Sequence, residues 1–114
     1  MQNILKLYTK KDCAACENVK EFLKGFHVPE NAIQILDITN DLVMIGRLKD
    51  GIPGVENGEP TMFTAMSFPS LEVIDKASLQ TIGLITPSAS IIEFISMLNF
   101  PPVVVDTPVG KPLE

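Results

Sequence analysis

Two strand patterns with one helix pattern between them fill the first 38 residues of this 114-residue chain. Residues 4–9 and 33–38 are apolar and β-prone without a helix breaker, as is typical of strands. The helix is predicted from residue 13 to about 25, where apolar residues recur at i, i+3, i+4 and i+7: Val19, Phe22, Leu23 and Phe26. A strand–helix–strand unit places its strands in parallel, so we expect an α/β fold.

A shorter helix pattern follows the second strand. Asn40 or Asp41 is placed to cap it, and the helix is predicted over residues 42–49, with Gly51 as its stop. Three Gly and two Pro then fall within residues 51–60, which predicts a loop.

Two apolar runs in the second half predict the strands that close the sheet. They cover residues 61–68 and 71–75, and Pro69 with Ser70 separates them, which predicts an antiparallel hairpin. Together with a final helix, the predicted order is β-α-β-α-β-β-α, with a central mixed four-stranded sheet flanked by helices.

The final helix pattern begins with a capping residue and a proline. Thr86 and Pro87 fit the N-cap and the first helical position, and the helix is predicted to reach about Asn99. Residues 101–114 hold four Pro and no helical period, so they are predicted to be an extended or disordered tail. We therefore expect one domain over residues 1–100 and a proline-rich tail over 101–114.

The charge of the chain limits its partners. A net charge of −5 argues against sequence-independent nucleic-acid binding, which needs a basic surface. No signal peptide and no apolar stretch of 18 residues are present, so we expect a cytoplasmic monomer that does not enter membranes. Five of the nine basic residues lie near the cysteines, as a local positive field or as an exposed helix face: Lys6, Lys10, Lys11, Lys20 and Lys24.

The two cysteines, Cys13 and Cys16, stand at the start of the first predicted helix. The free N–H groups and the dipole of a helix N-terminus favour an anion, and hence the thiolate of Cys13. Cys16 follows one turn later on the apolar stripe, so it should face inward. This placement predicts that Cys13 attacks a disulfide as the nucleophile and that Cys16 resolves the mixed disulfide. Asp12 is expected to cap this helix, although its charge opposes the thiolate.

A Cys-x-x-Cys pair is also half of a zinc site. Zinc takes four ligands, and His27 is the one further candidate of the usual kind in the chain. We therefore expect no metal site, and the strand–Cys-x-x-Cys–helix context favours redox chemistry.

The residues around the pair carry a family resemblance. Residues 8–16 resemble the Tyr-x-Lys-x-x-Cys-x-x-Cys opening of glutaredoxins and of the small redoxins that serve ribonucleotide reductase. The C-terminal half is more similar to thioredoxin. Residues 59–63 match its cis-proline, threonine and apolar strand, and residues 81–86 are similar to its Val-Gly-Ala-Leu-Ser stretch.

The resemblance, which covers residues 3–99, implies a thioredoxin-like fold and a protein-disulfide reductase with Cys13 and Cys16 as its catalytic residues. It also implies a cis-proline beside the cysteines. Pro60 is preferred for this role to Pro53, because an apolar strand should follow directly. The substrate-binding residues that it implies are Pro60, Thr61, Glu59, Lys10 and Gly83.

The implied partners are disulfide-containing proteins, with ribonucleotide reductase among the candidates. Thioredoxin reductase or glutathione would donate the electrons, and no bound cofactor is implied. The chain departs from the family at Ala14 and Ala15, which match neither the Gly-Pro of thioredoxin nor the Pro-Tyr of glutaredoxin. Two alternatives stay open: a redox-inactive thioredoxin-fold module that binds proteins, and metal or iron–sulfur binding through the cysteine pair.

Overall fold

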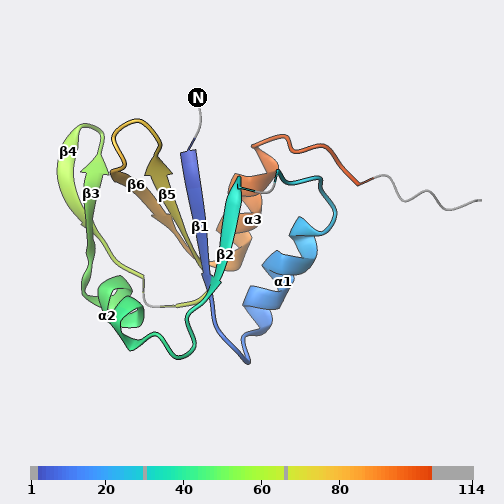
Figure 1. Cartoon of the computed structure of the whole chain (residues 1–114), viewed down its shortest axis with the longest axis horizontal. Coiled ribbons are helices and arrows are strands. Elements are labelled where there is room, and N and C mark those ends of the chain that lie inside the picture. Colours follow the sequence, from blue (N-terminus) through green and yellow to red (C-terminus); the bar gives the residue numbers. More distant parts are fainter. Residues whose placement is uncertain (1–2, 30, 66, 104–114) are drawn as a thin grey trace, which may run out of the picture.

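The computed structural model describes residues 3–29, 31–65 and 67–103 of the chain. Six strands and three helices follow one another along these residues (Figure 1). In chain order they are β1 (Asn3–Thr9), α1 (Ala14–Leu23), β2 (Ile33–Asp37), α2 (Leu42–Asp50), β3 (Ile52–Glu56), β4 (Glu59–Phe63), β5 (Ser70–Asp75), β6 (Thr81–Ile85) and α3 (Ser88–Ser96).

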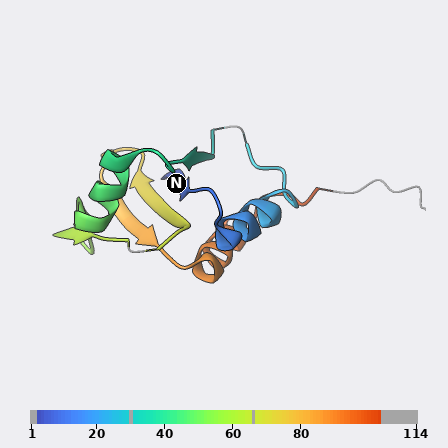
Figure 2. The same ribbon diagram turned by 90° about the horizontal axis from the view of Figure 1, so that it is seen from below.

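The six strands form one mixed sheet in the order β2-β1-β5-β6-β3-β4. β1 runs parallel to β2 and antiparallel to β5, while β6 runs antiparallel to β5 and parallel to β3. α1 and α3 lie on one side of the sheet and α2 lies on the other (Figure 2). The prediction of a mixed sheet flanked by helices is confirmed, but the predicted number of four strands is wrong.

β6 and β3 have no counterpart among the predicted strands, and β3 lies in the segment predicted as a loop, residues 51–60. β3 and β4 pair there as an antiparallel hairpin. Its turn is formed by Asn57 and Gly58, whose φ angles are 53° and 81°, as the favoured two-residue hairpin turn requires. Pro53 and Pro60 argued against strands in this segment. β4 is the edge strand of the sheet, where a proline is tolerated.

The predicted hairpin between residues 61–68 and 71–75 is wrong. The first run contributes only its start to the sheet, as the end of β4, and β5 pairs instead with β1 and β6. A turn after β5 makes the β5–β6 hairpin, and Asp75 holds it by accepting the N–H and the hydroxyl of Ser78. The second run is a strand over its whole length and the first only over residues 61–63, and pairing partners depend on contacts that are distant in sequence.

The start of α2 is confirmed, and the start of α3 differs from the prediction. Asp41 caps α2 by accepting the N–H of Met44 at 3.0 Å. In α3, Pro87 is itself the N-cap and no side chain caps the helix, so Thr86 is not the capping residue. The helix ends at Ser96, before the predicted Asn99.

Two apolar clusters hold the sheet and its helices together, one on each face. The larger cluster lies beneath α1 and α3 and consists of Leu5, Leu7, Val19, Leu23, Ile33, Leu71, Val73, Ile91 and Ile95. The smaller cluster lies on the face of α2 and consists of Tyr8, Ile38, Leu48, Ile52 and Ala65.

The first residues of the predicted tail bind the segment that follows α1. The N–H of His27 donates to the carbonyl of Pro101 at 2.6 Å, and the N–H of Val103 donates to the carbonyl of Gly25 at 2.8 Å. The rest of that prediction, on residues 104–114, lies outside the described residues. None of the helices in the described part of the chain has the length and apolar character needed to cross a membrane.

Candidate active site

Cys13 is the N-cap residue of α1. Its backbone is extended, and its Sγ accepts the N–H of Cys16 at 3.1 Å. Its carbonyl accepts the N–H of Glu17 at 3.1 Å, which begins the helical hydrogen-bond pattern. The prediction that Asp12 caps this helix is wrong. Asp12 takes a left-handed conformation, with φ of 56°, and turns the chain so that the cysteine is the last residue before the helix.

Cys13 and Cys16 form a disulfide, with 5.2 Å between their Cα atoms. Such a separation is ordinary for a disulfide, so the pair bonds within the turn where α1 starts. The two residues differ in exposure, because Cys13 is half-buried whereas Cys16 is completely buried. A molecule that approaches from solvent can therefore reach the sulfur of Cys13 only.

The loop before β5 packs against the cysteine pair. The carbonyl oxygen of Phe68 lies 3.7 Å from Sγ of Cys13. In the disulfide this sulfur has no proton, so the approach is a van der Waals contact; the thiol form could donate a hydrogen bond to this oxygen. Two contacts fix the position of this loop. Pro69 and Ser70 are fully buried, and the Ser70 hydroxyl donates to the carbonyl of Ser67 at 2.7 Å.

The proline beside the cysteines is Pro69. Among the described residues, the peptide bonds before Pro69 and Pro87 are cis. The prediction of a cis bond before Pro60, with Pro53 as the alternative, is therefore wrong. The criterion that an apolar strand should follow directly was sound, since β5 begins immediately after Pro69. That signal was present in the sequence, but Pro69 was assigned to a hairpin turn.

Of the other predicted substrate-binding residues, Lys10 lies near the cysteines. Its Nζ is 5.4 Å from the centre of the Phe68 ring, the side chain of the same residue whose carbonyl contacts Cys13. A cation over an aromatic face is attracted to it, so Lys10 helps to hold this loop.

Glu59 and Thr61 lie elsewhere, next to Pro60 in β4. β4 is four strand positions from β1, or about 19 Å at roughly 4.8 Å per strand. Gly83 lies in β6 opposite Val73 of β5. The structure therefore brings Lys10 to the cysteine pair and leaves the three residues of β4 at the far edge of the sheet.

The local positive field is smaller than five lysines would give. Lys20 and Lys24 pair with Glu17 and Glu21 on the exposed side of α1, at 3.3 and 2.8 Å. Lys6 alternates along β1 with Leu5 and Leu7, so it belongs to the opposite face of the sheet. Lys10 and Lys11 remain near the cysteines.

Within residues 3–29, 31–65 and 67–103, no three His, Cys, Asp or Glu side chains are grouped so as to hold a metal ion. The cysteine pair is thus not extended by further ligands from these residues.

Comparison with known proteins assigns the chain to no family. No family model matches the chain, and no curated protein or solved structure gives a significant match. Its chemistry has to be inferred from its own geometry.

Proposed function

We propose that this chain is a thiol–disulfide oxidoreductase that reduces protein disulfides with the dithiol of Cys13 and Cys16. The observation that carries the proposal is the position of Cys13 as the N-cap of α1, with the N–H of Cys16 directed at its sulfur. That N–H and the helix dipole favour a negative charge on this sulfur. Cys16, completely buried one turn behind, is within bonding reach of Cys13 and out of reach of solvent.

The reaction begins with the reduced pair. The Cys13 thiolate attacks one sulfur of a substrate disulfide, forms a mixed disulfide and releases the other substrate sulfur as a thiolate. Cys16 gives its proton to the substrate thiolate just released, attacks the sulfur of Cys13 and releases the second substrate sulfur as a thiolate. Two electrons have then passed to the substrate, and the enzyme holds the Cys13–Cys16 disulfide found in this structure. A donor, thioredoxin reductase or glutathione, restores the dithiol.

A thioredoxin-like fold and membership of the thioredoxin/glutaredoxin superfamily are part of the same proposal. The order β2-β1-β5-β6, with α1 and α3 on one side and α2 on the other, supports them because it supplies the four-stranded sheet that the resemblance implies. The β3–β4 hairpin is then an addition after α2, which extends the sheet beyond β6. We also propose a cytoplasmic location, with ribonucleotide reductase among the candidate substrates.

The loop at Phe68, beside Cys13, is the part of the surface along which a substrate chain would bind. Its support is the contact of 3.7 Å between the Phe68 carbonyl and Cys13, with Lys10 over the Phe68 ring. A backbone bound along this loop would carry its disulfide to the sulfur of Cys13.

The pH dependence of alkylation tests the proposal. Iodoacetamide reacts with thiolates, so the rate in a Cys16→Ser variant reports the ionisation of Cys13, and a Cys13→Ser variant reports Cys16. We expect the midpoint for Cys13 to fall clearly below about 8.5, the ordinary value of a free cysteine. Insulin reduction with dithiothreitol as donor should be accelerated by the wild type and by neither variant.

The two single variants serve as matched controls, because each keeps one thiol in the same fold. Midpoints at or above about 8.5 for both thiols would contradict the proposal. Insulin reduction that is equally fast without the protein would also contradict it.

A further inference from the structure

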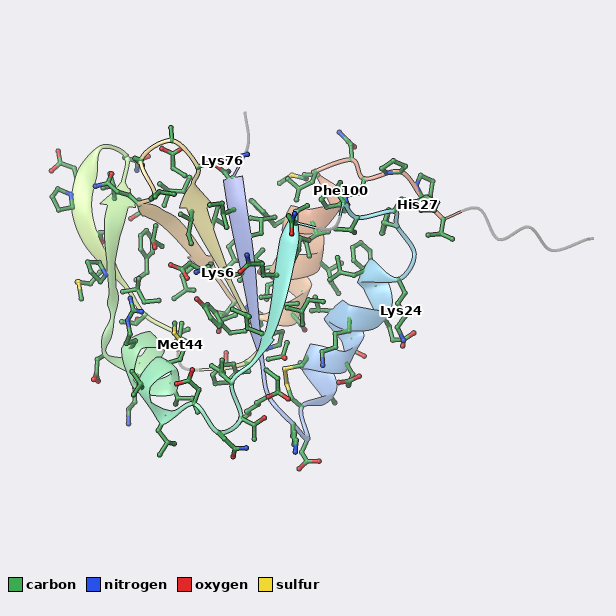
Figure 3. The ribbon with its side chains drawn as sticks, viewed as in Figure 1. Lys6, Lys24, His27, Met44, Lys76 and Phe100 are labelled. Atoms are coloured by element: carbon green, nitrogen blue, oxygen red, sulfur yellow. A yellow bond between two sulfur atoms is a disulfide. The ribbon has the colours of Figure 1, made fainter. Side chains whose placement is uncertain are left out.

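A hollow of about 400 Å³ opens on the face of the sheet that α2 covers only in part. It lies between β1, the end of β2, the first turns of α2 and β5, on the side opposite α1. Figure 3 labels two of its residues, Lys6 on β1 and Met44 on α2. Its lining includes Lys6, Tyr8, Leu36, Met44, Arg47 and Glu72.

Glu72 reaches this hollow from a buried position on β5, with 6% of its surface exposed. Both of its oxygens are occupied. Oε1 accepts the hydroxyl of Tyr8 at 2.6 Å, and Oε2 accepts the hydroxyl of Thr81. Both oxygens of this buried carboxylate are therefore satisfied as acceptors by neutral donors, and neither forms an ion pair with a lysine or an arginine of the described residues.

The two other carboxylates of the hollow are engaged in the same way. Asp37 accepts the N–H and the hydroxyl of Thr39, and these bonds hold the pKa of Asp37 below its ordinary value. Asp41 caps α2 through the N–H of Met44. Both are exposed at the rim, where solvent screens their charge.

The two cations of the hollow, Lys6 and Arg47, form no ion pair within the described residues. The ion pairs of the described residues are both on α1, and neither involves Lys6 or Arg47. Lys6 is half-buried and lies opposite Glu72 in the β1–β5 ladder, yet it forms no ion pair with it. The hollow thus offers unused N–H donors of both side chains, and its apolar wall includes Leu36 and Met44.

We propose that this hollow binds a small organic anion, with a carboxylate or phosphate group held between Lys6 and Arg47 and an apolar body against Leu36 and Met44. Charged N–H donors bind such oxygens more strongly than neutral donors do. The volume suits a small molecule, since ligand sites commonly span about 300–1,000 Å³. The site uses neither cysteine, so it does not depend on the proposed redox function.

The test measures the binding of three probes of similar shape. Amide chemical shifts of the full chain report the binding of each probe. Benzoate and phenyl phosphate carry the two candidate head groups on the same ring, and benzyl alcohol is their neutral counterpart. We expect saturable shifts around Lys6, Met44 and Arg47 with at least one anion, and much weaker binding of the alcohol. The anion that binds more tightly identifies the head group.

Two variants assign the binding to the hollow. Arg47 is exposed on α2, so Arg47→Gln should fold normally and weaken the anion about tenfold. Lys6→Met should weaken it to a similar degree. Lys49→Met, on the same helix but outside the hollow, is the matched control and should leave binding unchanged. Absence of saturable shifts, or equal binding by Arg47→Gln and the wild type, overturns the proposal.

Discussion

The sheet is covered by apolar side chains beneath α1 and α3, whereas its other face holds a buried carboxylate beside an open hollow. β1 contributes side chains to both faces of the sheet. Leu5 and Leu7 point to the first, and Lys6 and Tyr8 point to the second. Strict alternation along this one strand separates an apolar face from one that combines a smaller apolar cluster with polar side chains.

The difference follows from the number of helices on each side. Two helices bury most of the first face, and the proposed redox site is at the start of one of them, where the packing fixes its position. One helix of nine residues covers only part of the second face. The uncovered part can be polar, and Tyr8 and Thr81 satisfy the carboxylate that it contains.

Substitutions at two neighbouring positions of β1 should give the largest difference in the free energy of unfolding. Leu7 is completely buried in the larger cluster, so Leu7→Ala leaves a cavity and should lower the free energy of unfolding by about 2–5 kcal/mol. Lys6→Met keeps the length of the side chain and removes an unpaired charge, so it should cost less than about 1 kcal/mol. Urea unfolding followed by circular dichroism measures both changes. Equal losses would mean that the two faces do not differ in packing as described.

Tyr8→Phe should have an intermediate effect, because it removes one of the two donors to Glu72. The loss of this hydrogen bond leaves the buried carboxylate with one donor, which should lower the free energy of unfolding by about 1–3 kcal/mol at pH 7. Burial, together with the hydrogen bond to Glu72, raises the pKa of Tyr8 above its ordinary value of 10. The unfolded chain therefore loses this proton first, and stability should fall as the pH rises above about 10.

The comparison with Tyr8→Phe isolates that pH dependence. The variant lacks the titrating hydroxyl, so the difference in stability between it and the wild type should narrow above about pH 10, by at most about 1.4 kcal/mol per pH unit. Tyr8 is the one tyrosine of the chain, so the ultraviolet absorbance of tyrosinate reports its titration directly. Titration of the folded protein at the ordinary pKa of 10 would show that Glu72 and burial do not act on this hydroxyl.

The sequence was sufficient for features that depend on nearby residues. The strand before the cysteines and the helix after them follow from local periodicity, and capping chemistry narrowed the α2 cap to Asn40 or Asp41, of which Asp41 is the cap. The inward position of Cys16 was predicted from its place on the apolar stripe, and it is completely buried.

The errors arose from local signals that were read wrongly, the caps placed at Asp12 and Thr86 among them, and from contacts that no local signal carries. Asn57 and Gly58 form a hairpin turn that was assigned to a loop because prolines flank it. Pro69 was assigned to a turn instead of the site. The contact between Tyr8 and Glu72 joins residues 64 positions apart, so its prediction would have required the β1–β5 register.

Gly58→Ala should have a smaller effect than Leu7→Ala or Tyr8→Phe, and that effect should be confined to one face of the sheet. Gly58 has a φ of 81°, which costs an alanine about 1 kcal/mol, and its turn sets the register of β3, which supplies Ile52 to the smaller cluster. Amide hydrogen exchange should quicken in residues 52–63 and stay unchanged in β1. Gly46→Ala is the matched control, because a Cβ there meets nothing within 4 Å and alanine favours the α2 helix by about 0.5–1 kcal/mol. If both alanines stabilised the protein, the strained turn would not be holding β3 in place.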